Sequence, residues 1–298
     1  MNLGDLHEMP RDNEVDVYGI THVGKVREQN EDQFLICSLH KQMEVHQTSL
    51  PDVRQLSLKG ERLAFLALVA DGLGGHAAGE EASRVALETL ISYVNHSMEC
   101  YYTGDPGQER EFLEQLNKSV LECHVKVLEE AQNHPELKGM ATTLTLLLAI
   151  WPRAFVVQVG DSRCYRLRDG VLSQITRDQT VAQDMVDKGM LPEDQADRTR
   201  WSHILSSAIG GSRARPEISK IDLNWGDVLL LCTDGLSNYV PAEKIQERLQ
   251  SLRTARLACK QLVADALEAG GGDNITLIVG HPRRARREPA TQKFSMKS

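Results

Sequence analysis

The amino-acid sequence predicts an α+β fold in which an antiparallel sheet is segregated from the helices. Ten short runs rich in β-branched and aliphatic residues follow one another, several with short connections, which favours antiparallel pairing. Stretches with helical periodicity lie in blocks between and after those runs instead of alternating with them. The length of 298 residues and the apolar fraction of 41% are ordinary for a soluble globular protein with a substantial core.

Each strand is predicted from an apolar run bounded by polar or turn-forming residues. In chain order the runs are 17–23, 33–37, 64–70, 143–150, 155–159, 164–167, 171–175, 218–223, 228–232 and 275–279. Asp169 and Gly170 separate two of these runs in CYRLRDGVLSQI, and an Asp-Gly pair at that place predicts a hairpin turn.

The helices are predicted from apolar residues spaced three and four apart. One helix is expected over residues 78–94 and a second over 109–131, and together they form a helix pair. A third is expected over residues 255–267, where Thr254 supplies the N-cap.

Three segments show neither pattern. We expect residues 41–62 to form a polar, irregular surface loop, and residues 180–203 to leave the sheet with short helical pieces. Residues 281–298 carry four Arg and two Lys against one Glu, and we interpret them as a basic, solvated tail. A contact of this tail with an acidic partner or an anionic surface is the alternative.

Composition excludes several classes of protein. No apolar run approaches the roughly 20 residues of a membrane span. The polar, acidic start is not a secretory signal. Six cysteines lie far apart without a CxxC pair, which argues against a thiolate zinc site or a disulfide framework and favours a cytoplasmic location. A net charge of −8 argues against a general nucleic-acid binder.

Carboxylates stand at the ends of the apolar runs. Asp71, Asp161 and Asp234 end the runs in AFLALVADG, AFVVQVGDS and DVLLLCTDG. Asp273 and the pair Glu31-Asp32 directly precede other runs. Because the end of one antiparallel strand lies beside the beginning of its neighbour, these acids can fall on one edge.

Acids gathered on one edge predict a cation site. Such carboxylates repel one another and are partly desolvated, so either their pKa values rise or a cation neutralises them. All-oxygen ligands select Mg²⁺ or Mn²⁺ over zinc. The glycines after Asp71 let a backbone carbonyl turn toward a metal and a bulky substrate approach. The same dipeptide at Asp169 lacks an apolar run before it, and we interpret it as a plain turn.

Other phosphate-handling and hydrolytic motifs are weak or missing. Residues 72–77 match GxGxxA, but no βαβ series follows, and Asp71 stands where a pyrophosphate must approach. The sequence has no GxxxxGK[ST], no HExxH, and no Cys followed six residues later by Arg. GDSR at 160–163 is not the GxSxG of a nucleophile elbow.

Taken together, the motifs resemble those of the metal-dependent protein phosphatases (the PPM or protein phosphatase 2C type), most of all their bacterial branch. In order they are RxxNED (27–32), DGLGGH (71–76), MATT (140–143), GDSR (160–163), ITRDQT (175–180), LSSAIGG (205–211), TDGLSN (233–238) and GGDN (271–274). The resemblance divides the chain into an N-terminal extension (1–14), a phosphatase domain (15–280) and the basic tail (281–298).

The resemblance implies an α-β-β-α sandwich of two antiparallel sheets flanked by helix pairs, with a two-metal cleft at one end. Asp71 would bridge two Mn²⁺ or Mg²⁺ ions, the Gly72 carbonyl would bind one of them, and Asp234 and Asp273 the other.

Other residues would support this metal centre. Glu31 and Asp32 would hold metal-bound waters. Asp161 would help to bind a third, weaker ion, and Arg27 would clamp the substrate phosphate. The residues 180–203 would form a flap that sets substrate access.

The implied activity is hydrolysis of phosphoserine and phosphothreonine in proteins by a water activated between the two metals, without a phosphoenzyme. The partners would be phosphorylated proteins and a Ser/Thr kinase that this activity opposes in signalling. Two alternatives stay open: a non-catalytic phosphoprotein-binding regulator on the same fold, and an enzyme for another phosphate ester.

The chain departs from the family pattern at four positions. Leu73 stands where many eukaryotic members have a His, which leaves a metal-bound water or His76 as the proton donor to the leaving group. Gln179, Ala141 and Asn238 stand where the family often has His, Gly and Asp. None of these changes removes an expected ligand of the two-metal core.

Overall fold

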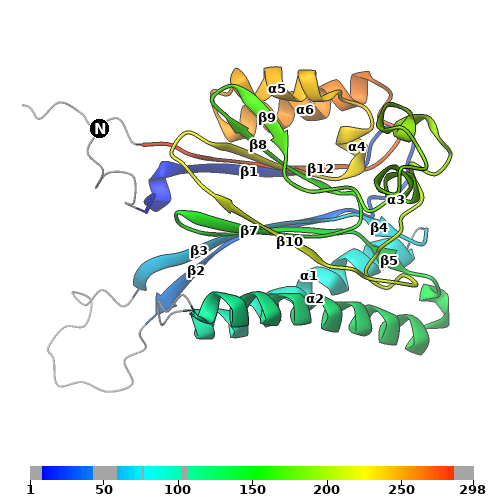
Figure 1. Cartoon of the computed structure of the whole chain (residues 1–298), viewed down its shortest axis with the longest axis horizontal. Helices are drawn as coiled ribbons and strands as arrows, with labels where there is room; N and C mark the ends of the chain where they lie inside the picture. Colours follow the sequence, from blue (N-terminus) through cyan, green and yellow to red (C-terminus); the bar gives the residue numbers. More distant parts are fainter. Residues whose placement is uncertain (1–8, 43–58, 76, 102–106, 285–298) are drawn as a thin grey trace, which may run out of the picture.

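Two antiparallel sheets lie face to face between two layers of helices in the computed structural model, which describes residues 9–42, 59–75, 77–101 and 107–284 (Figure 1). The first sheet has the order β1-β12-β11-β8-β9 and the second β10-β7-β6-β3-β2. The predicted α+β sandwich is therefore confirmed.

The strands have the following bounds. In the first sheet they are β1 (Val15–His22), β12 (Ile275–Pro282), β11 (Val228–Cys232), β8 (Arg163–Arg168) and β9 (Val171–Gln174). In the second they are β10 (Glu217–Asp222), β7 (Arg153–Val159), β6 (Leu144–Ile150), β3 (Lys59–Ala70) and β2 (Gln33–Gln42). A two-stranded ribbon joins β4 (Gly72–Leu73) to β5 (Ala141–Thr142).

Helices cover the outer face of each sheet (Figure 1). The second sheet carries α1 (Ala77–Tyr101) and α2 (Gly107–Asn133), and the first carries α5 (Ala242–Gln250) and α6 (Ala255–Glu268). Short helices α3 (Val181–Asp187), η4 (Glu193–Arg198) and α4 (Asp234–Ser237) lie at one end of the sandwich, and η2 (Asp12–Glu14) and η3 (Pro135–Leu137) complete the set. None of the helices within the described ranges is long and apolar enough to cross a membrane.

All ten predicted strands are present, and the differences lie at their ends. The predicted bounds of the loop over 41–62 are wrong at both ends, because β2 continues to Gln42 and β3 begins at Lys59. Backbone pairing in the hairpin holds these polar residues in strand without an apolar pattern. Residues 43–58 lie outside the described part of the chain. β12 also runs on through His281 and Pro282, which the sequence division had assigned to the tail.

Local turn and cap predictions are confirmed where they can be checked. Asp169 and Gly170 have φ values of 50° and 79°, and they connect β8 to β9 as a two-residue hairpin turn. Thr254 caps α6 by accepting a hydrogen bond from Leu257 N. The helix α5 was not predicted, since only Ile245 and Leu249 are buried along it and two apolar residues make a weak periodic signal.

Three apolar layers follow from the alternation of side chains along the strands. In β3, Leu66 and Leu68 pack in the layer toward α1 and α2, whereas Ala67 and Val69 pack between the sheets. A third layer joins the first sheet to α5 and α6. The spacing argued against a disulfide framework, and five cysteines are free in the structure: Cys37, Cys123, Cys164, Cys232 and Cys259.

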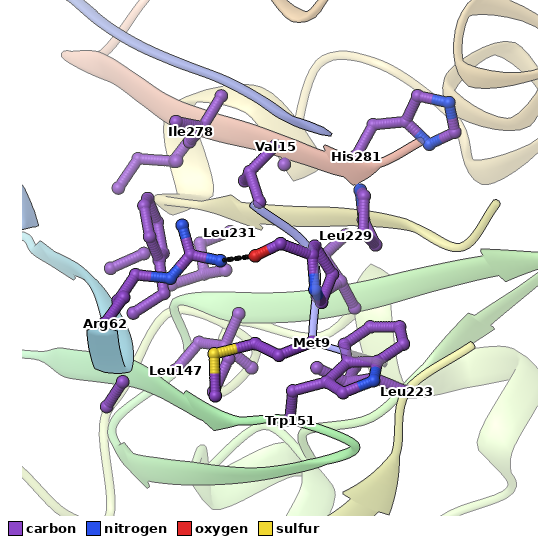
Figure 2. Close-up of a pocket in the computed structure, with 18 of the residues that line it drawn as sticks. Met9, Val15, Arg62, Leu147, Trp151, Leu223, Leu229, Leu231, Ile278 and His281 are labelled. Atoms are coloured by element: carbon purple, nitrogen blue, oxygen red, sulfur yellow. Dashed lines mark hydrogen bonds between the residues drawn. The ribbon is translucent and has the colours of Figure 1, made fainter. Parts of the chain in front are cut away.

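The layer between the sheets encloses an apolar cavity of ≈ 70 Å³ (Figure 2). Leu147, Leu229, Leu231 and Ile278 contribute to its wall from both sheets. The segment before β1 closes it: Met9 lines the cavity, and the Arg62 guanidinium donates hydrogen bonds to the Pro10 carbonyl and to Asp12 Oδ1. We call residues 9–12 the strap.

Candidate active site

The end of the sandwich opposite the strap holds a polar pocket of ≈ 550 Å³. Its wall includes the following residues of the sequence-predicted site: Arg27, Glu31, Asp71, Gly72, Asp234 and Asp273. These come from four distant stretches of chain, because the loops that follow or precede β3, β11, β12 and β2 all open at this end. An adjoining pocket of ≈ 290 Å³ is lined by Asp161 and shares Asp234, His203 and Asn238 with the first.

The backbone at Asp71 is fixed by two threonines of the MATT segment. Thr143 Oγ1 accepts a hydrogen bond from Asp71 N at 3.0 Å, and the Asp71 carbonyl accepts from Thr143 N at 2.9 Å. Thr142 Oγ1 donates to the same carbonyl at 2.8 Å. Both threonines are buried. Their hydrogen bonds therefore fix the backbone of Asp71, the residue directly after β3.

Close backbone packing explains two glycines beside Glu31. A Cβ on Gly72 would lie 2.2 Å from the Gly79 carbonyl oxygen and 2.6 Å from that of Glu31. A Cβ on Gly79 would lie 1.9 Å from Glu31 Oε2. Ser83 Oγ donates to the Glu31 carbonyl at 2.7 Å, which ties this loop to α1. A side chain at Gly72 would push the backbone of the Glu31 loop away, and one at Gly79 would displace the Glu31 carboxylate.

Asp234 and Asp273 are positioned by local hydrogen bonds. Asp234 begins α4 directly after β11, and its Oδ2 accepts from Asn238 Nδ2 at 3.0 Å. Asp273 Oδ1 accepts from Asn274 N at 2.8 Å, and Asp273 Oδ2 accepts from Arg27 Nη2 at 2.8 Å. The guanidinium of Arg27 therefore lies beside the carboxylates.

Asn274 is a site residue for which sequence analysis predicts no role. Its Oδ1 accepts from Glu31 N at 2.9 Å, and its Nδ2 donates to the carbonyls of Val23 and Gln29, both at 2.9 Å. One buried amide thereby holds the loop that carries Arg27 and Glu31 against Asp273. The GGDN motif marked the position, but only the fold shows which loop it binds.

Asp32 lies behind the pocket wall and not on it. Its side chain is buried, and Oδ2 accepts from Thr233 Oγ1 at 2.9 Å. Thr233 directly precedes Asp234. Through Thr233, Asp32 therefore contacts the strand end that carries Asp234.

Mutual proximity and burial disfavour the charged forms of the acids. Burial raises the pKa of Asp32 to about 7, and the charges of Asp234 and Asp273 act in the same direction. Burial likewise raises the pKa of Asp161 to about 8, with Asp234 and Asp178 adding to it. The pKa of Asp71 is well above its usual range, through burial and then the charges of its neighbours. Burial also raises the pKa of Asp234.

The donor set fits a hard divalent cation. The pocket offers carboxylate oxygens and a backbone carbonyl, which are the ligands of Mg²⁺ and Mn²⁺. Asp32 Oδ1 and Asp234 Oδ1 are buried without a hydrogen-bond partner among the described residues. Within those same residues, no three His, Cys, Asp or Glu side chains are already arranged around a common point.

The flap expected over 180–203 forms one wall of both pockets through His203. Thr180 caps α3 by accepting from Gln183 N, and Arg215 Nη2 holds α3 through Asp184 Oδ2 at 3.2 Å. His203 could not be singled out beforehand, because it is an isolated His in a polar segment. Leu73 also lines the larger pocket, and His76 lies outside the described residues.

Comparisons with known proteins agree on one family. The family profile described as protein phosphatase 2C matches residues 52–269. The serine/threonine protein phosphatase PstP of Mycobacterium tuberculosis is 37% identical over 216 residues, which cover 72% of this chain and 40% of that relative. The serine/threonine phosphatase stp of Listeria monocytogenes is 31% identical over 215 residues, covering 72% of this chain and 83% of the relative.

Solved structures share the fold. The crystal structure of the Mycobacterium tuberculosis serine/threonine phosphatase PstP/Ppp matches with a TM-score of 0.72 and 30% identity, over 91% of this chain and 99% of that one. The catalytic domain of PstP in complex with two manganese ions matches with a TM-score of 0.68 and 31% identity, over the same shares.

Proposed function

This chain belongs to the protein phosphatase 2C family, and from that premise we propose that it hydrolyses phosphoserine and phosphothreonine in proteins with the help of two bound divalent cations. The observation that carries the proposal is the convergence of Asp71, Asp234 and Asp273 with Arg27 in one pocket. The aligned region covers 40% of the length of the mycobacterial relative. The activity is therefore a proposal for this chain and is not carried over from that longer protein.

Each acid has a proposed role at the cations. Asp71 would bridge the two ions, the Gly72 carbonyl would bind one, and Asp234 and Asp273 would bind the other. The shared pocket supports this assignment, as does Asp234 Oδ1, which has no hydrogen-bond partner in the described part of the chain. Mn²⁺ or Mg²⁺ would lower the pKa of a water and offset charge on the phosphate oxygens.

The remaining acids would act around the two-cation core. Glu31, on the pocket wall, and Asp32, behind it, would hold waters that complete the coordination. Asp161 lines the adjoining pocket with Asp234, which suits a third and weaker cation. Asn238 lines both pockets and donates to Asp234 Oδ2. The family often has an Asp at the position of Asn238.

Arg27 would hold the substrate phosphate. Its side chain is half exposed, so the guanidinium can reach a phosphate in the pocket while Asp273 keeps it on the pocket side. A guanidinium binds two phosphate oxygens at once, which orients the ester. Leu73 offers no proton to the leaving group, which distinguishes this pocket from one with a His at that place.

The proposed substrates are phosphorylated proteins, and the proposed partner in signalling is a Ser/Thr kinase whose products this chain dephosphorylates. The flap would set access, because it forms a wall of both pockets. Removal of residues 180–203 should change the KM for a phosphoprotein. Unchanged kinetics would rule out this role of the flap.

The deciding assay measures hydrolysis of a phosphothreonine peptide and of a small aryl phosphate with Mn²⁺ and with EDTA. We expect Mn²⁺-dependent turnover of both and its loss in Asp234→Ala. Asp169→Asn is the matched control, since Asp169 precedes a glycine in a hairpin turn away from the pocket. Peptide binding without turnover would favour the regulator, and turnover of the aryl phosphate alone would favour another ester.

A further inference from the structure

Gln179 lies between the turn that carries Asp161 and the base of the flap. Its side chain is 1% exposed, and it directly precedes Thr180, the N-cap of α3. The sequence singled it out only as the residue that stands where the family often has a His. The fold places it between two segments that are far apart along the chain.

Two hydrogen bonds join Gln179 to the Asp161 turn. Gly160 N donates to Gln179 Oε1 at 2.9 Å, and Gln179 N donates to the Gly160 carbonyl at 3.0 Å. Gly160 immediately precedes Asp161 and has a φ of 103°. A Cβ at Gly160 would lie 2.7 Å from the Thr143 side chain, so the turn has little freedom to find other partners.

Two further hydrogen bonds join Gln179 to the segment that follows the flap. Gln179 Nε2 donates to the Arg215 carbonyl at 2.8 Å, and Ser206 N donates to the Gln179 carbonyl at 2.8 Å. Residue 179 precedes the flap and Ser206 follows it. Gln179 thereby holds together the two chain segments on either side of the flap, which we call its base. It also links this base to the Asp161 turn.

The chemistry of the amide matters at this place. A primary amide accepts and donates at the same time, which a carboxylate or a thioether cannot do. Without Oε1 the buried Gly160 N–H loses its partner, and without Nε2 the Arg215 carbonyl loses one.

Gln158 provides the comparison within the same turn. Its Nε2 donates to the carbonyls of Gly160 and Ser162, and its Oε1 accepts from Arg177 N. None of these hydrogen bonds reaches the segment after the flap. Gln158 therefore joins the turn to Arg177, which precedes the flap, whereas Gln179 joins the turn to the segment that follows the flap.

We infer that Gln179 is a positioning residue that couples the base of the flap to the Asp161 turn, so that the segment facing the substrate and the turn bearing an acid of the adjoining pocket move together. The structural coupling stands on these hydrogen bonds, and only its kinetic consequence rests on the proposed function. In the wild-type chain, where both hydrogen bonds are present, a flap that loosens independently of the turn would contradict it.

The test compares Gln179→Met, Gln179→Glu and Gln158→Met in the metal-free full chain. Two readouts need no activity: amide exchange at Gly160, and tryptic cleavage after the exposed Lys188 in the flap. In Gln179→Met we expect both rates to rise about tenfold, the equivalent of one lost buried hydrogen bond. In Gln158→Met we expect faster exchange at the turn and wild-type flap cleavage.

Gln179→Glu separates the hydrogen bond to Gly160 from the hydrogen bond to Arg215. Its carboxylate still accepts from Gly160 N but cannot donate to the Arg215 carbonyl. We expect faster flap cleavage with nearly wild-type exchange at Gly160, and this variant decides the matter if Gln179→Met does not fold. Wild-type flap cleavage in the Gln179 variants, or equal acceleration in Gln158→Met, would overturn the inference.

Kinetics with Mn²⁺ add the functional consequence. We expect Gln179→Met to raise the KM for a phosphothreonine peptide several-fold more than the KM for a small aryl phosphate. Equal changes would show that flap coupling does not reach the substrate. An inactive wild-type chain would refute the proposed function and leave the exchange and cleavage results intact.

Discussion

The two ends of the sandwich are built from the same strands and have opposite chemistry. At one end β3 finishes in Asp71 and β11 leads into Asp234, and the loops between them hold buried acids. At the other end the beginnings of β1 and β3 enclose an apolar cavity under the strap (Figure 2). Figure 1 shows the short helices α3 and α4 at one end of the sandwich and the beginning of β3 at the opposite end.

The difference shows where folding and function conflict in this protein. Buried acids that repel one another destabilise the fold unless a cation neutralises them. The apolar end contributes packing and has no part in the proposed chemistry. We therefore expect substitutions at the acid end to change activity with little loss of stability, and substitutions at the strap end to do the reverse.

The largest effect should come from Asp234→Asn. Loss of one charged ligand should lower phosphatase activity by more than about 100-fold, in line with the removal of one transition-state contact. The same change relieves repulsion from Asp273 in the metal-free protein. Its midpoint of thermal unfolding should therefore equal or exceed that of the wild type. A large fall in that midpoint would contradict the assignment of Asp234 to a functional cluster.

The converse variant is Leu231→Ala in the wall of the apolar cavity. Leu231 is 1% exposed and lines the cavity, so truncation should enlarge a void and cost about 2–5 kcal/mol in the free energy of unfolding. Val171→Ala is the control, because that side chain is 63% exposed. The kcat measured well below the unfolding midpoint should stay unchanged. A fall in kcat would show that the two ends are coupled.

The pH dependence of stability should reveal the acid end directly. Burial raises the pKa of Asp32 to about 7 and of Asp161 to about 8, whereas an unfolded Asp titrates near about 3.9. Between these values the folded protein binds more protons than the unfolded chain, so its free energy of unfolding falls as the pH rises.

Urea unfolding of the metal-free protein at pH 5 and pH 8 measures this dependence. We expect lower stability at pH 8, a weaker dependence in Asp32→Asn, and recovery at pH 8 when Mn²⁺ is added. Stability that rises from pH 5 to pH 8 without metal would be incompatible with clustered, desolvated acids.

The smallest effect is expected for Arg62→Met. The change removes the hydrogen bonds to Pro10 and Asp12 but keeps an apolar stem over the cavity. Asp12 is 68% exposed, so its ion pair contributes little, and the total loss should be about 1 kcal/mol. Asp12→Asn isolates the ion pair. Urea unfolding measures both, and an Arg62→Met loss as large as that of Leu231→Ala would show that the strap is a larger part of the core.

Most of the fold was predictable because its signals are local. Apolar runs predicted the ten strands of the two large sheets but not the short β4 and β5, and Asp169-Gly170 predicted its hairpin turn. The boundaries were less predictable. The polar ends of β2 and β3 are strands only because each pairs with the other, and α5 carries too few apolar residues to stand out.

The acids of the candidate site were also predictable, since each stands where an apolar run begins or ends. Their assignment as cation ligands stays a prediction. The residues that position them were not predictable: Asn274 joins two loops more than 200 positions apart, and Gln179 joins Gly160 to Arg215. An amide in a sequence shows no sign of which distant carbonyl it will meet.

The sequence by itself determined the strands, the main helices and the set of acids, because side-chain alternation, helical spacing and turn residues act over a few neighbouring positions. Only the tertiary structure decided that Asp32 lies behind the pocket, that His203 faces Asp234, and that Arg62 closes the opposite end. Each of these depends on which strands pair and in which register, and that choice is made by burial across the whole chain.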